Sequence, residues 1–178
     1  MLPSLSGVSR LHSNNPTLPH LYFFNFVFHS HFFLGYWVQL HALTSADRSY
    51  KLRITIKIAN STTYIQVYED FKVTSAATGY RLTFNDSFSN GPDDCFLPLL
   101  RAKFSTYDHD RDETDGVNCA LKRKGGFWFR GSSCGACNPH GIIYQTPDGL
   151  LTGAEDQAFW SFLGNVAPLK ISMFLVPL

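Results

Sequence analysis

The sequence predicts a single domain of the α+β class, and three stretches of the chain lead to this prediction. Apolar residues at helical spacing within 33–43 predict a short helix, and alternating residues within 50–73 predict an antiparallel hairpin. After Ser87 the periodicity fades into Gly, Pro, Asp and Cys residues, which are typical of long loops joined by short strands. A regular first part and a loop-rich second part are therefore expected to share one core.

The helix and the first strand follow from two different apolar periods. In the predicted helix, Leu34, Trp37 and Val38 fall on one face, with His41 one turn later. In the strand predicted over 50–58, apolar and polar residues alternate, so one face belongs to the core and the other to solvent. The apolar residues of this strand are Leu52, Ile54, Ile56 and Ile58, and the polar ones are Lys51, Arg53, Thr55 and Lys57.

The second strand and the turn before it complete the hairpin. Asn60 and Ser61 have turn chemistry, and residues 62–73 are rich in β-branched and aromatic side chains, so the two strands are expected to pair antiparallel. Residues 81–84 predict a further short strand.

Composition indicates an aromatic core and argues against two classes of partner. The 178 residues include 16 Phe, 8 Tyr and 3 Trp, so the folded chain must bury many rings. The formal net charge is only +1, and the sole basic triplet, Lys122 to Lys124, is interpreted as a solvated turn. We therefore expect neither nucleic acid nor an anionic membrane as a partner.

Residues 1–32 are predicted to be irregular or foreign to the domain. Residues 1–20 are rich in Pro, Ser and Asn and are expected to have no regular structure. The apolar stretch 21–40 is about long enough to span a bilayer, but polar residues interrupt it, so a strand or foreign sequence is favoured over a membrane helix. No ordinary signal peptide is visible after Met1.

The cysteines and two glycosylation triplets favour an extracellular protein. Four cysteines crowd into one region, which indicates either a stapled set of loops or a metal site. They are Cys95, Cys119, Cys134 and Cys137. Asn60 and Asn85 each begin an Asn-x-Ser/Thr triplet and are candidate glycosylation sites. Together these features indicate secretion.

An acidic loop is the strongest candidate for a metal site. Five carboxylates fall within eight residues, and a hard cation would offset their mutual repulsion. They are Asp108, Asp110, Asp112, Glu113 and Asp115. An EF-hand beginning at Asp108 would require glycine at position 113 and glutamate at position 119, where the sequence has Glu113 and Cys119. Another calcium-binding design and a merely exposed acidic turn both remain open.

A series of rare elements in this part of the chain resembles a known family. The run Phe104-Ser-Thr-Tyr-Asp-His-Asp-Arg-Asp112 is followed by Gly116, Asn118-Cys119-Ala120, Gly125-Gly-Phe-Trp128 and Cys134-Gly-Ala-Cys-Asn138. In this order the elements resemble the signature of fibrinogen C-terminal-like (fibrinogen-related) domains. Weaker similarity extends the resemblance over 33–178, without the front part of the family's domain. It implies an α+β fold with a central antiparallel sheet, short helices and a loop-rich, calcium-binding C-terminal part.

The resemblance also implies a metal site and a disulfide. Calcium would be held by the side chains of Asp110 and Asp112 and by the backbone carbonyls of Thr114 and Gly116. The family's disulfide would join Cys119 to Cys134. Cys95 and Cys137 could pair with each other or stay free.

A ligand pocket beside the calcium loop is implied as well, of the kind that binds acetylated sugars in ficolins and tachylectins. Its candidate residues are Ser133, Gly135, Ala136, Tyr144 and Trp160. The family places a histidine where this chain has Gly135, which offers neither a side-chain donor nor a ring. The peptide bond between Ser133 and Cys134 is expected to be cis.

The function expected is calcium-dependent recognition of a carbohydrate or glycoprotein ligand outside the cell, without catalysis. No Gly-x-Ser-x-Gly or His-Glu-x-x-His motif is present, and an oligomer is conceivable in a full-length form. One alternative is a truncated structural relative that binds no ligand. A second is a thiol oxidoreductase or zinc-binding protein that uses Cys134 and Cys137, since their spacing also serves those chemistries.

Overall fold

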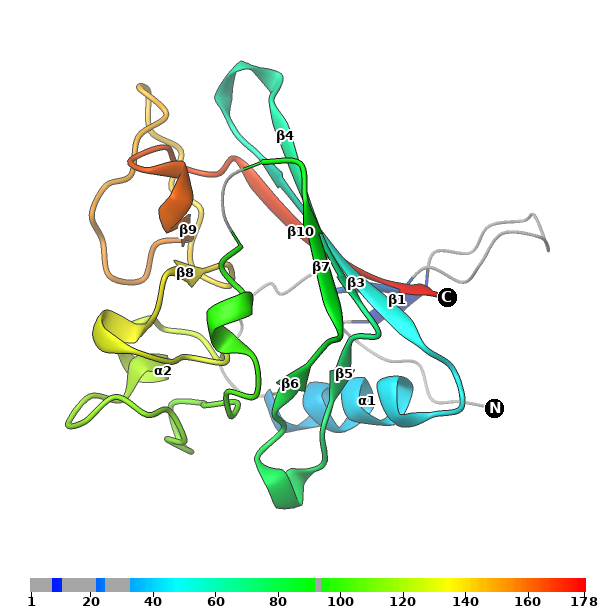
Figure 1. Ribbon diagram of the computed structural model, residues 1–178. Helices are drawn as coiled ribbons and strands as arrows, with labels where there is room; N and C mark the ends of the chain where they lie inside the picture. The colour runs from blue at the N-terminus through cyan, green and yellow to red at the C-terminus, as the bar shows by residue number, and fades with distance from the viewer. Residues whose placement is uncertain (1–7, 11–21, 25–32, 92–93) are drawn as a thin grey trace.

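The computed structural model describes residues 8–10, 22–24, 33–91 and 94–178, and its centre is a six-stranded antiparallel sheet (Figure 1). The strand order is β1-β2-β10-β3-β4-β7, and two further sheets have two strands each, β5-β6 and β8-β9. The strands are β1 Val8–Arg10, β2 Tyr22–Phe24, β3 Tyr50–Lys57, β4 Thr63–Glu69, β5 Lys72–Val73, β6 Leu82–Thr83, β7 Asp86–Ser89, β8 Cys137–Asn138, β9 Phe159–Trp160 and β10 Lys170–Pro177. The α-helices are α1 Phe33–Ser45 and α2 Cys119–Lys122, and the 3-10 turns are η1 Ala59–Ser61, η2 Ala76–Thr78, η3 Leu97–Leu99, η4 Ser132–Cys134 and η5 Ser161–Leu163.

The predicted helix and hairpin are both confirmed. Alternation in β3 buries Ile54 and Ile56 completely and leaves Arg53 exposed, as expected for a strand with one face on the core. β3 pairs antiparallel with β4 on one side and with β10 on the other. The C-terminal strand therefore lies inside the sheet rather than at its edge, and Ile54 has Gln66 and Met173 as cross-strand neighbours.

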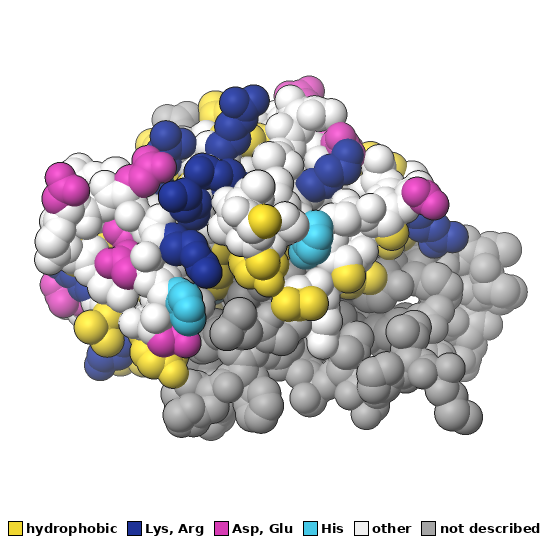
Figure 2. All heavy atoms as spheres, turned by 90° about the horizontal axis from the view of Figure 1, so that it is seen from below, with side chains coloured by type: hydrophobic (Ala, Val, Ile, Leu, Met, Phe, Trp, Pro, Cys, Tyr) yellow, Lys and Arg dark blue, Asp and Glu magenta, His cyan; other side chains and the backbone are white. Residues whose placement is uncertain are grey.

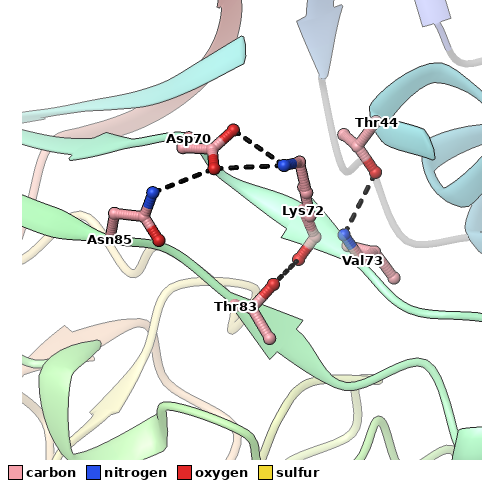
Figure 3. Close-up of polar contacts among 6 residues, drawn as sticks. All are labelled: Thr44, Asp70, Lys72, Val73, Thr83 and Asn85. Atoms are coloured by element: carbon pink, nitrogen blue, oxygen red, sulfur yellow. Dashed lines mark hydrogen bonds and ion pairs between the residues drawn. The ribbon is translucent and has the colours of Figure 1, made fainter. Parts of the chain in front are cut away.

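The second strand ends earlier than the sequence predicts. β4 stops at Glu69, Asp70 takes the left-handed conformation with φ of 50°, and β5 then pairs with β6 in a separate sheet. Figure 3 shows how side chains hold this break: Asp70 Oδ2 accepts hydrogen bonds from Lys72 Nζ at 3.1 Å and Asn85 Nδ2 at 3.0 Å. The turn lets the chain leave the large sheet while its polar groups stay bonded.

Helix α1 is attached to the small sheet through one buried hydroxyl. Thr44 Oγ1 donates to Leu40 O at 2.8 Å and accepts from Val73 N at 3.0 Å, so a backbone N–H of β5 is satisfied by the helix (Figure 3). His41 Nδ1 lies 2.8 Å from Val73 O and strengthens the same contact. In Figure 1 α1 lies beside β5 and β6, beneath the large sheet.

Two strands occupy part of the segment expected to be irregular or foreign. β1 pairs with β2, and β2 pairs with β10 through Phe24 and Met173. The expectation of no structure in residues 1–20 is therefore wrong for Val8–Arg10, because the open edge of β10 offers backbone partners. The other parts of 1–32 lie outside the described residues, and the division of the chain at residue 33 stays a prediction.

Both glycosylation candidates are exposed. Asn60 has φ of 61°, and its Oδ1 accepts hydrogen bonds from the backbone and hydroxyl groups of Thr62. Asn85 instead uses its amide nitrogen to bond Asp70. Glycosylation at either position stays a prediction.

Aromatic rings join the sheet to the loop-rich part. Phe96 stacks on Tyr68 of β4 at 5.0 Å between ring centroids and on Trp160 of β9 at 6.0 Å. Trp128 meets Phe71 and Phe104 edge-on, and its indole N–H donates to Tyr80 O at 2.7 Å. These rings are buried, as the aromatic composition led us to expect. Across the described parts of the chain, no helix has the length and apolar character needed to cross a membrane.

Candidate functional site

The acidic loop is fixed at its base by backbone pairing. Ser105 exchanges two backbone hydrogen bonds with Phe127, at 3.0 Å and 3.2 Å. The hydroxyl of Ser105, itself fully buried, also accepts from Arg111 N at 2.8 Å. The loop that carries the carboxylates thus begins at a rigid point of the core.

Asp112 connects the loop to the first disulfide. Its Oδ1 accepts from Thr114 N and its Oδ2 from Cys119 N, both at 2.9 Å. The hydroxyl of Thr114 donates to Gly131 O at 3.1 Å and lies 3.4 Å from Cys119 Sγ. One carboxylate therefore sets the path of the chain from the acidic loop into α2.

Asp110 lies against Asp112. Its Oδ1 accepts from Asp112 N at 3.3 Å, and its pKa is raised by burial first and by the neighbouring Asp112 carboxylate second. Both causes oppose the ionised form, so in the absence of a cation the two carboxylates repel each other. A divalent cation between them would remove this repulsion.

The residues present fit calcium by the chemistry of their donors. Asp110, Asp112, Thr114 and Gly116 supply only oxygen, which calcium prefers over nitrogen or sulfur. Within the described ranges, no three or more His, Cys, Asp and Glu side chains gather around a common metal position. An ion here would therefore need peptide carbonyls and water beside the two aspartates, which is the ligand set that the sequence predicts.

The four cysteines form two disulfides. Cys119 is bonded to Cys134 with a Cα–Cα distance of 5.4 Å, the pairing that the family resemblance implied. Cys95 is bonded to Cys137 with a Cα–Cα distance of 6.1 Å, which settles the point that the sequence left open. Neither cysteine of the Cys134-x-x-Cys137 motif is therefore a thiol, and the two are not bonded to each other. The oxidoreductase or zinc alternative is wrong for this structure, because both chemistries need a thiolate or a joined pair at that motif.

Asn118 is a structural residue that the sequence reasoning missed. Its Oδ1 accepts from Leu121 N at 2.8 Å and caps α2, while its Nδ2 donates to Tyr107 O at 3.2 Å. The signal was available, since asparagine directly before a helical turn is a preferred N-cap. The cap joins the two ends of the acidic loop.

Arg123 was also missed, because the basic triplet was interpreted as a solvated turn. Its guanidinium donates to Ser133 O at 2.7 Å and to Glu155 O at 3.1 Å, and lies 4.9 Å from the centroid of the Phe159 ring. Burial lowers the pKa of Arg123, and the charge of Glu155 partly opposes this shift. The solvated-turn interpretation is therefore wrong for Arg123.

The two lysines of the triplet make ion pairs with the same loop. Lys122 Nζ lies 3.0 Å from a Glu155 carboxylate oxygen, and Lys124 Nζ lies 3.4 Å from an Asp156 one. Because both pairs are at the surface, they contribute little stability compared with the bonds of Arg123. Together with Arg123 they attach the end of α2 to residues 155 and 156.

The backbone at the predicted pocket differs from the expectation. No peptide bond among the described residues is cis, so the expected cis link between Ser133 and Cys134 is wrong here. The turn is made instead by three successive left-handed residues, with φ of 58° at Ser133, 64° at Cys134 and 87° at Gly135. A Cβ atom at Gly135 would lie 3.2 Å from Arg130 O, so glycine suits both the dihedral angle and the available space.

The two aromatic residues predicted to line the pocket differ in burial and in their contacts. Trp160 is completely buried against Phe96 and pairs with Cys137 in the small sheet, so its role as a pocket wall is wrong. Tyr144 is half-buried, and its hydroxyl donates to Asp156 Oδ1 at 3.0 Å, a hydrogen bond that raises the pKa of Tyr144. Ala136 accepts a backbone bond from Ser161 N at 2.9 Å. The structure therefore groups Ser133, Gly135 and Ala136 at one turn and links Tyr144 to the loop that contains Asp156.

Sequence similarity connects the chain to one family of known proteins. A model of the C-terminal globular domain of fibrinogen beta and gamma chains matches residues 22–169. Tenascin of Gallus gallus is 36% identical over 97 residues, which cover 53% of this chain and 5% of tenascin. Human fibrinogen-like protein 1 is 32% identical over 125 residues, covering 63% of this chain and 39% of that protein. The chain thus spans 39% or less of the length of these two relatives.

Solved structures with the same fold include two that are informative. The fibrinogen-like globe domain of human ANGPTL6 has a TM-score of 0.69 and 26% identity, over 80% of this chain and 62% of that one. Lamprey fibrin D-dimer, solved with the peptide ligand Gly-His-Arg-Pro-amide, has a TM-score of 0.63 and 25% identity, over 79% of this chain and 49% of that one.

Proposed function

The chain belongs to the fibrinogen C-terminal globular domain family, and from this premise we propose that it is an extracellular recognition domain whose binding surface is ordered by calcium. The proposed ligand is a glycoprotein or its carbohydrate. The binding surface is formed by the acidic loop, residues 105–118, together with the turn at residues 131–136. Specificity then lies in loops that a rigid core positions.

Two observations support an extracellular location. Both disulfides belong to the oxidising environment outside the cytosol. Relatives such as tenascin, fibrinogen-like protein 1 and angiopoietin-4 are secreted extracellular proteins. Relatives of this type are recognition or structural proteins rather than enzymes, and we propose the same of this chain.

The observation that carries the proposal is the contact between Asp110 and Asp112 beside the Cys119–Cys134 disulfide. When bound, calcium would supply a positive charge to both carboxylates. Asp112 already holds Thr114 N and Cys119 N, so any ordering of its carboxylate is passed to the disulfide and to Ser132–Cys134. The chain would in this way present the turn at 131–136 in one conformation and lower the entropy lost when a ligand binds.

Calcium binding is tested by thermal unfolding with and without calcium. The melting temperature of the unchanged protein should rise in calcium, because an ion that binds only the folded state stabilises it by mass action. Asp110→Asn should abolish that rise. Asp108→Asn removes the same charge from an exposed neighbouring residue, and the rise in melting temperature should persist in this variant. The absence of a rise in the unchanged protein, or an equal rise in Asp110→Asn, would contradict the calcium site.

Ligand recognition is tested separately on an array of glycans and glycoproteins, with calcium and with chelator. Retention that requires calcium and is lost in Asp110→Asn supports the proposed function. Arg123 and Glu155 occupy the space beside Ser133, and Gly135 has no side chain to contact a ligand. A structural domain that binds no ligand is therefore the second candidate. A protein that gains stability in calcium but is retained by nothing on the array would favour that candidate.

A further inference from the structure

Lys and Arg side chains gather in a stripe on one face of the molecule (Figure 2). The contacts around residues 100–103 bring together four basic residues from three segments. They are Arg81 before β6, Arg101 and Lys103 after η3, and Arg130 before η4. No two of them are adjacent in sequence, so the group exists only in the folded chain.

Two of the four, Arg81 and Arg130, donate side-chain hydrogen bonds to the backbone. Arg81 Nη1 donates to Arg101 O at 2.5 Å, and Arg130 Nη1 donates to Leu100 O at 3.0 Å. Two guanidinium groups therefore bond consecutive carbonyls of one segment. The stem of Lys103 packs on Gly79, where a Cβ atom would lie 3.2 Å from Lys103 Cγ.

The charges of this group are poorly balanced. Arg130 pairs with Glu113, Nε to Oε2 at 3.2 Å. Among the residues that the structure describes, no Asp or Glu lies within ion-pair distance of Arg81, Arg101 or Lys103. Arg101 and Arg130 are both exposed. Like charges placed together repel, and a polyanion laid across them would turn the repulsion into attraction.

We propose that these four residues, Arg81, Arg101, Lys103 and Arg130, which we call the basic stripe, bind a linear sulfated polysaccharide. Guanidinium groups match the paired oxygens of a sulfate as they match those of a phosphate or carboxylate. Several such groups close together suit a chain of regularly spaced anions. The disulfides place the stripe outside the cytosol, where sulfated polysaccharides are the accessible linear polyanions.

Nucleic acid fits the stripe less well. Proteins that bind single strands alternate basic side chains with exposed aromatic rings on which bases stack. Here the aromatic residues next to the stripe in sequence, Tyr80, Phe104 and Phe129, are all buried in the core. The stripe thus offers charge without a stacking surface.

The proposal is tested by equilibrium binding of the purified domain to heparin, over a series of salt concentrations. The variant replaces Arg101 by Asn and Lys103 by Gln. Asn suits position 101 because it tolerates the φ of 67° found there. We expect at least a tenfold loss of affinity and a salt dependence lowered by about two counterions.

The matched control is Arg53→Gln with Lys57→Gln, which removes the same charge from the exposed face of β3. Its affinity should stay within about twofold of the unchanged protein if location rather than total charge matters. Circular dichroism and melting temperature verify that both variants are folded. An equal loss in the control, or heparin binding no tighter than binding of desulfated heparin, would overturn the proposal.

Two further arms separate the stripe from other sites and partners. Heparin binding should persist in chelator, because the stripe does not use Asp110 or Asp112. The heparin proposal can therefore fail or succeed independently of the calcium proposal. Single-stranded DNA of similar charge should bind more weakly than heparin. Equal affinity for DNA would mean a general polyanion site and would contradict the assignment to a sulfated polysaccharide.

Discussion

The large sheet and the loop-rich part, residues 94–169, are stabilised in different ways. In the sheet, β3 pairs along its whole length with β10 and along most of it with β4, and alternating apolar residues fill the core. In the loop-rich part the two strands have two residues each, and two disulfides replace the long ladders. Individual side chains then hold the backbone, as Asp112, Asn118 and Arg123 do.

The two parts should therefore respond differently to substitution. The sheet distributes its stability over many equivalent contacts, so one substitution removes one packing contribution. The loops concentrate it in a few groups that each satisfy several backbone atoms, so one substitution releases a whole turn. Stability measurements on paired variants in each part therefore test this difference.

Removal of the second disulfide should have the largest effect. Cys95→Ala with Cys137→Ala opens a crosslink between residues 42 apart and should cost about 4 kcal/mol in the chain-entropy model. Removal of Cys119 and Cys134, which are 15 apart, should cost about 3 kcal/mol. Urea unfolding measures both. A cost below about 1 kcal/mol for each pair would mean that the loops do not depend on their crosslinks.

A cavity in the sheet should come next. Ile54→Ala leaves a space in a fully buried position between β4 and β10 and should lower the free energy of unfolding by about 3 kcal/mol. Arg53→Ala, on the exposed face of the same strand, should change it by less than about 0.5 kcal/mol. Similar losses in the two variants in urea unfolding would contradict the one-sided burial of β3.

His140 should make the loop-rich part sensitive to acid. Burial lowers its pKa to about 4, although the hydrogen bond between Nδ1 and Gly126 O at 2.7 Å acts in the opposite direction. Below the ordinary histidine pKa the unfolded chain binds a proton that the folded chain does not, so stability falls as pH falls from about 6.5 towards 4. Between pH 7 and pH 5 the loss should be about 2 kcal/mol.

The variant His140→Gln isolates this contribution from that of the carboxylates, which also titrate in acid. Its unfolding free energy should depend less on pH over the same interval, whatever its stability at pH 7. The same slope in both proteins would show that His140 does not remain neutral in the folded state.

Arg123 should give the smallest but most specific effect. Arg123→Ala removes two bonds to the carbonyls of Ser133 and Glu155 and should cost about 1–2 kcal/mol, since hydrogen bonds to charged groups are among the stronger ones. Lys124→Ala removes the ion pair of an exposed lysine and should cost less than about 0.5 kcal/mol. Thermal unfolding of both variants makes the comparison. Equal losses of stability in the two variants would support the original interpretation of the triplet as a solvated turn.

Local patterns predicted much of the fold. The alternation in residues 50–58 fixed which face of β3 is buried, because successive side chains of a strand point in opposite directions. The ordered motifs from Phe104 to Asn138 indicated the family, and with it the Cys119–Cys134 pair, because such elements occur in one order in that family. The same resemblance implied Asp110 and Asp112 as calcium ligands, whereas their spacing alone left an exposed acidic turn equally open.

Long-range contacts could not be predicted from these patterns. The partner of Cys95, the complete burial of Trp160 and the bonds of Arg123 all depend on which distant segments meet. The break after Glu69 was missed because β-branched residues continue past it, whereas Asn85 and Lys72 stabilise the turn at Asp70.

Residue order alone was enough to specify the fold class, the family and the acidic loop, because each rests on neighbours along the chain. The folded arrangement was needed for the second disulfide, the left-handed turn at 133–135 and the basic stripe. Charge illustrates the physical reason. The sequence has a net charge of +1 and no basic run beyond one triplet, yet folding brings basic residues from distant segments together. Electrostatic interaction depends on distance in space and not on distance along the chain.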